Sequence, residues 1–366
     1  MIIAADIRVL ASVNPSGISE YTDQVLANMI ALDKNIKWKL WFAGKSPKIL
    51  PWMYSSNVTL HKIAYSGRAF IARSRFTRRP FIDHMISGAD IAFFPHFLLG
   101  ETSLKCRRVM TWHDLSYEHF SELLDMRHRF WHWWMKPHMQ AIGANKIIAV
   151  SHATANDLVR IYKIPKEKVQ VVYSGISPNL QPIAEDMVTE WRIAHRLPSK
   201  FILMFGTREP RKNFDVLLRA WRTLRMRHSD LGLVCMGDSG WGERIYNKNG
   251  LYIFPAVSSE DRIYAMNAAS VLVYPSLLEG FGFPPLEAMA CGTPVVASAN
   301  SAIAEISNSA CLLVDPYSVT SVANAINLAL TNDDVYARLI MRGFIHIQSF
   351  DWRNTAEQTL ATMVSS

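Results

Sequence analysis

The sequence predicts an α/β protein built from two doubly wound domains. Its 366 residues exceed the usual size of one domain, and 49% of them are hydrophobic, so each half can bury a core of its own. Short apolar or β-branched runs alternate along the chain with stretches whose apolar residues have helical spacing. This alternation is typical of parallel sheets flanked by helices, and the apolar runs indicate strands buried on both faces.

The candidate strands fall into two groups, one in each half of the chain. Residues 174–187, SGISPNLQPIAEDM, have the composition of an exposed connection between them. We therefore expect an N-terminal domain over 1–180 and a C-terminal domain over 181–366, with the last helix packing back on the first domain. The predicted strands lie within residues 1–10, 37–43, 58–63, 91–95, 107–114, 146–151, 169–175, 201–206, 232–238, 251–255, 270–276, 293–298 and 310–316.

Cysteine usage and the amino-terminal residues bear on the compartment. The four cysteines, Cys106, Cys235, Cys291 and Cys311, have neither metal-ligand spacing nor the density of a disulfide framework. The start MIIAADIRVL lacks a charged segment before a long apolar run, and no window approaches the roughly 20 apolar residues that span a bilayer. We expect a reduced, cytoplasmic protein that is neither exported nor membrane-spanning.

Positive charge is concentrated in the first half of the chain. Residues 1–180 contain 23 lysines and arginines against 13 acidic residues, whereas the remainder contains 16 against 18. Most of the excess lies in GRAFIARSRFTRRPF (67–81) and MRHRFWHWWMKPH (126–138), where basic and aromatic residues are interleaved. Such segments suit an anionic surface, either a membrane or a nucleic acid, although two of the three tryptophans Trp131, Trp133 and Trp134 could instead be buried.

Two carboxylates flank a glycine-rich loop in EGFGFPPLE (279–287). The preceding run is a predicted strand, and a helix follows with proline in its first turn and Gly292 after its end. Ligands of open parallel sheets bind at the carboxyl ends of strands, and a helix N-terminus there can hold a phosphate. Glu279 and Glu287 are therefore interpreted as acceptors for sugar and ribose hydroxyls; alternatively, Glu287 complements the helix dipole and Glu279 is solvated.

The stretch from Glu279 to Ser298 resembles the Glu-x7-Glu signature of the retaining family-4 glycosyltransferases, which have the GT-B fold of two Rossmann-like domains facing across a cleft. The resemblance implies that Glu279 contacts the donor sugar and Glu287 the ribose. Further matches occur in order along nearly the whole chain. By the same resemblance, the donor also contacts Phe281, Gly282 and Phe283.

A basic loop follows the predicted strand 201–206. Arg208, Arg211 and Lys212 precede an amphipathic helix, where cations oppose the helix dipole unless an anion lies between them; the alternative is solvated charge. Charge that develops on a departing nucleoside diphosphate must be met by cations and amide dipoles when no metal is present. Lys212, with Arg208 or Arg211 beside it, is similar to the family's basic pair, and the sequence leaves the choice of arginine open.

Two matches lie in the first half of the chain. The segment around Gly17 resembles the family's glycine-containing loop, whose amides reach the distal phosphate of the donor, although many relatives have two adjacent glycines there. Alternatively, Gly17 is only a turn residue. His113 ends a predicted strand and resembles the family's histidine beside the reacting sugar, where a neutral imidazole can bond a hydroxyl. Asp114 either positions the acceptor or caps the next turn. His96 ends another strand, with a structural role equally open.

Several motifs are absent. The sequence contains no Asp-x-Asp pair, no Cys/His cluster and no G-x-x-x-x-G-K-[ST] loop, so we expect chemistry that needs neither a metal nor a cofactor.

The resemblance implies a hexosyltransferase that uses a nucleotide-sugar donor and a glycan or polyprenyl-linked glycan acceptor. The form GTREPRKN (206–213) resembles bacterial mannosyltransferases of O-antigen or capsule assembly and favours GDP-mannose, with a UDP-sugar left open. The basic N-terminal domain predicts an association with the inner face of the cell membrane. The alternatives are a non-hydrolysing nucleotide-sugar epimerase and a nucleic-acid-binding protein, whereas the transferase itself should bind no nucleic acid.

Overall fold

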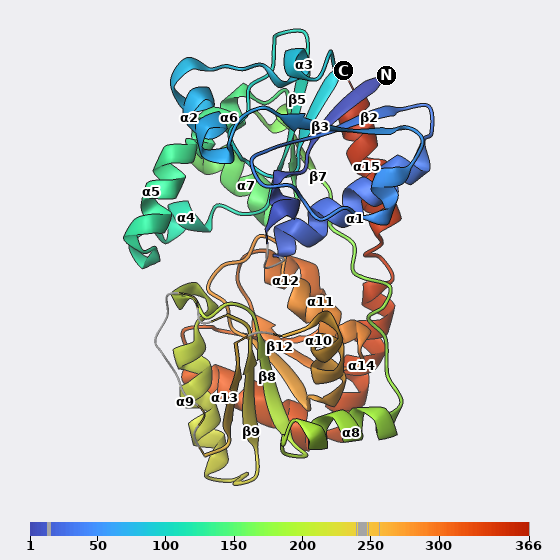
Figure 1. The fold of residues 1–366 in the computed structure, drawn as a ribbon. Helices are drawn as coiled ribbons and strands as arrows, with labels where there is room; N and C mark the ends of the chain where they lie inside the picture. The colour runs from blue at the N-terminus through green and yellow to red at the C-terminus, as the bar shows by residue number, and fades with distance from the viewer. Residues whose placement is uncertain (13–15, 239, 241–246, 248, 256, 366) are drawn as a thin grey trace. The chain divides into compact units, whose positions relative to one another are not determined.

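A computed structural model describes residues 1–12, 16–238, 240, 247, 249–255 and 257–365. The chain divides into two compact units (Figure 1): the first contains Met1–Gly175 and Phe350–Ser366, and the second contains Ile176–Ser349. The first unit thus ends slightly before the predicted boundary near residue 180, and the end of the chain returns to it.

The first unit contains a parallel sheet with the strand order β3-β2-β1-β4-β5-β6-β7. Its central strands are almost wholly buried, which explains their continuous apolar sequences. The strands are β1 (Ile2–Asp6), β2 (Lys37–Ala43), β3 (Val58–Ile63), β4 (Ile91–Phe94), β5 (Arg107–Trp112), β6 (Lys146–Ala149) and β7 (Val169–Val171).

Helices from both ends of the chain cover this sheet. Helices α1 and α15 lie side by side although one follows the first strand and the other ends the chain. A Cβ atom on Gly175 would lie 2.3 Å from the backbone nitrogen of Trp352, so the connection passes the start of α15 too closely for any side chain. The helices are α1 (Gly17–Leu32), α2 (Gly67–Thr77), α3 (Ile82–Met85), α4 (Ser116–His119), α5 (Met126–Met135), α6 (Pro137–Gly143), α7 (His152–Ile161) and α15 (Trp352–Val364).

The second unit contains another parallel sheet, with the order β10-β9-β8-β11-β12-β13. Each predicted strand run in the sequence contains one of the strands, so the predicted α/β fold with two parallel sheets is confirmed. The strands are β8 (Phe201–Phe205), β9 (Gly232–Met236), β10 (Leu251–Phe254), β11 (Val271–Tyr274), β12 (Val295–Ser298) and β13 (Leu312–Val314).

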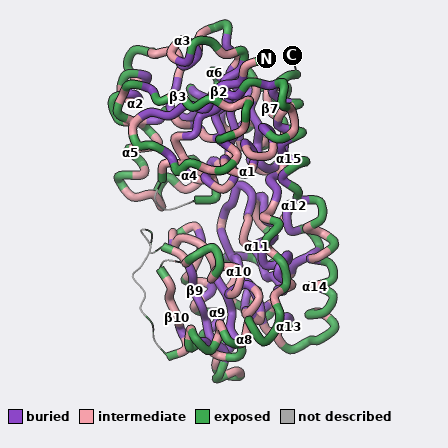
Figure 2. The backbone as a smooth tube through the Cα atoms, turned by 45° about the vertical axis from the view of Figure 1, so that its right-hand side comes forward, coloured by how far each residue is buried: buried purple, intermediate pink, exposed green. Residues whose placement is uncertain are grey.

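Helix α9 of the second unit buries one apolar face. In α9, Leu217, Ala220, Trp221 and Leu224 are buried at intervals of three and four residues. Figure 2 shows the buried strands at the centre of each unit and exposed stretches along the outer helices. The helices are α8 (Glu185–Ala194), α9 (Phe214–Arg225), α10 (Ser259–Ala268), α11 (Phe283–Ala290), α12 (Ser301–Ser307), α13 (Val319–Thr331) and α14 (Asp333–Ile347).

Within the residues that the structure describes, no helix is long and apolar enough to cross a bilayer. All four cysteines are buried and unbonded, and burial raises the pKa of each thiol.

Candidate active site

Two adjacent parallel strands place the predicted carboxylates and cations at one edge of the second sheet. Strands β8 and β11 are neighbours, so the loops that follow them leave the sheet side by side. The loop after β8 contains a short 3-10 helix, Pro210–Lys212, and the loop after β11 leads into α11. Gly282 caps α11 with a φ of 101°, a left-handed conformation that explains glycine at this position.

The start of α11 offers fewer amides to an anion than the sequence interpretation assumed. Its second and third residues, Pro284 and Pro285, have no N–H group, so among the first three helix residues only Phe283 has one. A phosphate near this loop would therefore depend on side-chain cations more than on the helix N-terminus.

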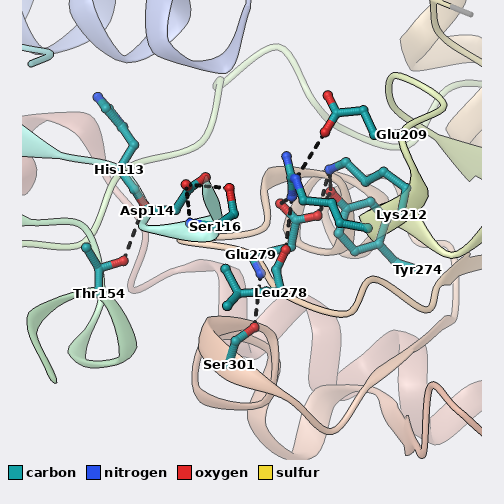
Figure 3. Close-up of polar contacts among 11 residues, drawn as sticks. His113, Asp114, Ser116, Thr154, Glu209, Lys212, Tyr274, Leu278, Glu279 and Ser301 are labelled. Carbon is teal, nitrogen blue, oxygen red and sulfur yellow. Dashed lines mark hydrogen bonds and ion pairs between the residues drawn. The ribbon is translucent and has the colours of Figure 1, made fainter. Parts of the chain in front are cut away.

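Glu279 lies at the centre of a buried ionic cluster (Figure 3). Its Oε1 accepts hydrogen bonds from Lys212 Nζ at 2.6 Å and from the Tyr274 hydroxyl at 3.1 Å, and its Oε2 pairs with Arg211 Nη1 at 2.9 Å. Lys212 also donates to the Tyr274 hydroxyl at 2.6 Å. The backbone N–H of Glu279 donates to Ser301 Oγ at 3.0 Å, which fixes the loop. The alternative of a solvated Glu279 is wrong, because its side chain is only 9% exposed.

The cluster keeps Glu279 ionised. Burial alone would raise the pKa of this carboxyl, but the Arg211 and Lys212 charges outweigh burial and lower the pKa to about 2. Burial lowers the pKa of Lys212 from its ordinary value, and the Glu279 charge opposes that change. Burial, reinforced by the Glu279 charge, raises the pKa of Tyr274 well above its ordinary value, so its hydroxyl stays protonated and can donate.

The two arginines of the basic loop differ in their partners. Arg211 donates to the Leu278 carbonyl at 2.9 Å and to Glu209 Oε2 at 3.1 Å, besides its contact with Glu279. Arg208 is 7% exposed, and its buried Nε and Nη1 atoms have no hydrogen-bond partner among the described residues. A buried guanidinium with unmet donors is costly unless an anion binds it, so Arg208 is the better candidate for contact with a phosphate.

Glu287 is buried in the second turn of α11. Both of its carboxylate oxygens accept from Nη2 of Arg262, a residue of α10 whose guanidinium lies 4.7 Å from the centre of the Phe205 ring. The rings of Phe281 and Phe283 are 5.0 Å apart on either side of Gly282. Tyr274 and Arg262 are site residues that the sequence interpretation missed.

In the first unit, Gly17 is the first residue of α1. Ser16 caps this helix: its Oγ accepts from the Ser19 N–H, and Ser19 Oγ accepts from the Ser16 N–H. Residues 13–15, which belong to the same predicted loop, lie outside the described residues.

His113 follows β5 directly. Its Nε2 lies 2.8 Å from the Pro95 carbonyl, and because a carbonyl only accepts, Nε2 carries the proton. Burial lowers the pKa of His113, although the hydrogen bond to Pro95 and the Asp114 charge oppose the change. The ring is thus neutral near pH 7, and its Nδ1 is an acceptor. The edge of Tyr21 packs against it at 4.9 Å.

Two neighbours of His113 have structural roles in the described contacts. Asp114 Oδ1 accepts from the N–H and hydroxyl groups of Ser116, so this carboxylate caps the following turn. The ring of His96, 6.1 Å from that of His113, stacks on Trp131, and burial lowers its pKa well below the ordinary value. Among the residues that the structure describes, no group of three or more His, Cys, Asp or Glu could hold a metal ion.

Comparisons with known proteins identify the family. Residues 188–344 match the family model described as "Glycosyl transferases group 1", and residues 87–180 match "Glycosyltransferase Family 4". Together with the mannosyltransferase relatives, the two matches support a family-4 glycosyltransferase. The chain is an enzyme of the transferase class with the GT-B fold, and the resemblance noted in the sequence is confirmed.

Relatives of this glycosyltransferase include two mannosyltransferases of Escherichia coli. The O-antigen chain mannosyltransferase B is 29% identical over 79% of this chain and 76% of its own length. The serotype-specific mannosyltransferase WbdA is 28% identical over 58% of this chain, but only 28% of WbdA is covered. Among solved structures, Anabaena HepE in complex with UDP-glucose matches with a TM-score of 0.72 over 100% of both chains, at 19% identity, which supports the fold alone.

Proposed function

We propose that this glycosyltransferase moves mannose from GDP-mannose to a hydroxyl of a glycan or lipid-linked glycan acceptor, with retention of anomeric configuration. The observation that carries the proposal is the buried Arg208 guanidinium, which precedes Arg211 and Lys212 in the same loop. Its Nε and Nη1 have no hydrogen-bond partner among the described residues, whereas Arg211 and Lys212 are paired with Glu279. Mannose is favoured because the relatives named above are mannosyltransferases, whereas the UDP-glucose held by HepE makes a UDP-sugar the competing donor.

In this proposal the donor diphosphate binds Arg208 and Lys212, which stabilise the charge of the leaving group. Arg211 and Tyr274 hold Glu279 in place. Glu279 Oε2 has one described partner and can accept a second hydrogen bond from a sugar hydroxyl.

Other contacts complete the donor site. Glu287, oriented by Arg262, accepts from the ribose, while the loop of Phe281, Gly282 and Phe283 lies along the donor. Within the first unit, the Gly17 amide can donate a hydrogen bond to a phosphate oxygen, and the neutral His113 can accept one from a sugar hydroxyl.

Retention follows from attack on the same face as departure. The bond between the sugar's anomeric carbon and the phosphate oxygen breaks while the acceptor oxygen bonds to that carbon. The phosphate oxygen released takes the acceptor's proton. Glu279 orients the sugar and does not attack it.

Arg208→Met is the sharpest test. Because Arg208 Nε and Nη1 have no hydrogen-bond partner among the described residues, loss of this side chain should leave the free energy of unfolding unchanged or higher. The affinity for the nucleoside diphosphate should fall by about 10- to 150-fold through loss of roughly 1.5 to 3 kcal/mol. Arg219→Met, on the exposed face of α9, is the matched control and should change neither quantity.

Calorimetry with GDP and UDP, and proton NMR of the products from GDP-mannose and UDP-glucose, give the donor and the anomeric configuration. Wild-type affinity in Arg208→Met would contradict the assignment. Conversion of the donor without any acceptor would instead indicate an epimerase.

A further inference from the structure

Two segments of the first unit that are far apart in the sequence meet through their aromatic side chains. The Phe76 ring of α2 lies 5.6 Å from the Trp134 ring of α5, edge to face, and the Arg75 guanidinium lies over Trp133 and Trp134 at 5.4 and 5.9 Å. Helices α2 and α5 occupy the same side of the first unit in both Figure 1 and Figure 2. We refer to the outer surface of residues 67–79 and 126–136 as the α2–α5 face.

The α2–α5 face exposes large apolar side chains. Phe76 is 74% exposed, Trp133 62% and Phe130 58%, and Met126 is also exposed. The Phe130 ring lies 5.6 Å from Trp133 and 5.8 Å from Trp134, so these rings form one continuous cluster. A contiguous exposed aromatic cluster on a folded protein marks an interaction surface.

Positive charge surrounds this cluster. Neither helix contains an acidic residue, and within the described part of the chain no arginine of either helix forms an ion pair with an acidic side chain. The exposed cations of the face are Arg68, Arg73, Arg78, Arg79, Arg127, Arg129 and Lys136.

We propose that the α2–α5 face docks on the interface of an anionic lipid bilayer. Arginine and lysine at such a surface each raise the affinity about fivefold, and tryptophan and phenylalanine insert at the headgroup level. A nucleic acid fits less well, because single-stranded bases need open aromatic faces for stacking. Here Arg75 covers Trp133 and Trp134, and the rings pack against one another.

The inner side of α5 connects this face to the candidate site of the first unit. Trp131 stacks on His96 at 6.2 Å with the planes 12° apart, and the His96 ring is 6.1 Å from that of His113. A bilayer on the outer side of α5 would therefore bring the headgroup of a lipid-linked acceptor towards the His113 edge. This last step rests on the proposed function, whereas docking itself does not.

The test is co-sedimentation of the full chain with vesicles of phosphatidylglycerol and phosphatidylcholine, compared with phosphatidylcholine alone. Replacing Arg73, Arg127 and Arg129 together with Ser should weaken binding to the anionic vesicles about 100-fold. The matched control replaces Arg219, Arg222 and Arg227 of the second unit with Ser, removes the same charge and should leave binding nearly unchanged. Phe130→Ser with Trp133→Ser should reduce the binding that remains at high salt, whereas Met341→Ser with Ile345→Ser should not.

Thermal unfolding checks that each variant is folded, and calorimetry with the nucleoside diphosphate shows that the donor site is intact, so a failure of docking is distinguishable from a failure of the proposed function. The proposal would be overturned if the two triple arginine variants lost vesicle binding equally, or if the protein showed no preference for anionic vesicles. Full displacement of the protein from the vesicles by an oligonucleotide would also overturn it.

Discussion

The carboxyl edges of the two sheets differ in their chemistry although both sheets are parallel and open. In the second unit, Arg211 and Lys212 surround the buried Glu279, and Arg262 holds Glu287. In the first unit, the edge contains His96 and His113 among aromatic rings, and burial keeps both histidines neutral. The charged edge suits an anionic diphosphate, and the neutral edge suits uncharged hydroxyl groups. The proposed transfer reaction uses groups of both kinds.

The charged edge is arranged in a way that suits the proposed diphosphate. Arg211 and Lys212 are already held in place by Glu279, while Arg208 Nε and Nη1 have no hydrogen-bond partner among the described residues. Because these charges are already fixed, binding of a donor at this edge would cost little free energy for rearranging the side chains.

Lys212→Met should have the largest effect on stability. It leaves Glu279 buried with one cation fewer and removes a hydrogen bond from Tyr274, so we expect the free energy of unfolding to fall by about 3 to 5 kcal/mol. Urea unfolding at pH 7 measures the loss, and donor binding should also be lost. Lys200→Met, an exposed lysine of the same unit, is the control and should cost little. A loss below about 1 kcal/mol at Lys212 would mean that the cluster is solvated in solution.

Glu279→Gln tests the same cluster through pH. The pKa of Glu279 lies at about 2 in the folded chain, below its ordinary value of 4.5, so its stabilising contribution is complete above pH 4.5 and is lost as the pH falls through about 2. The wild type should therefore exceed the variant by roughly 3 kcal/mol at pH 7, and by progressively less below pH 4.5. Chemical denaturation at several pH values gives the difference; a gap independent of pH would show that Glu279 is not held ionised.

Tyr274→Phe should have a smaller effect. It removes one hydroxyl that touches both Lys212 and Glu279 while leaving the ring in place, so the expected loss of stability is about 1 kcal/mol. If Tyr274 positions the pair, the turnover rate should fall more than the affinity for the donor. Tyr317→Phe, at an exposed position of the same unit, is the control. A change in donor affinity alone would instead indicate that the hydroxyl contacts the donor.

The positions of the strands, and of the loops that contain the candidate residues, could be predicted from the sequence. Apolar runs and the spacing of Glu279 and Glu287 are local features. The sequence could not choose between Arg208 and Arg211, since that choice depends on which guanidinium reaches the Leu278 carbonyl and Glu279 in another loop. Only Arg211, in the 3-10 helix Pro210–Lys212, is shown to do so. Arg262 gave no signal, because an arginine in an amphipathic helix is usually solvated. The contact between α2 and α5 could not be predicted from local sequence patterns either, because β4 and β5 lie between the two helices in the chain.

His113→Gln tests the neutral edge of the first sheet, and its effect on stability should appear mainly below pH 6.5. Because burial lowers the pKa of His113, the unfolded chain binds a proton more readily than the folded chain, and stability must fall as the pH drops below the ordinary value of 6.5. Glutamine removes this contribution, so between pH 7.5 and 5.5 the wild type should lose more stability than the variant, by at most about 1.4 kcal/mol per pH unit. His96 and His132, whose pKa values are also lowered by burial, are present in both proteins and cancel in the comparison. Chemical denaturation over this range measures the difference; parallel curves would mean that His113 is solvated and charged in solution, and would remove it as the neutral acceptor of a sugar hydroxyl.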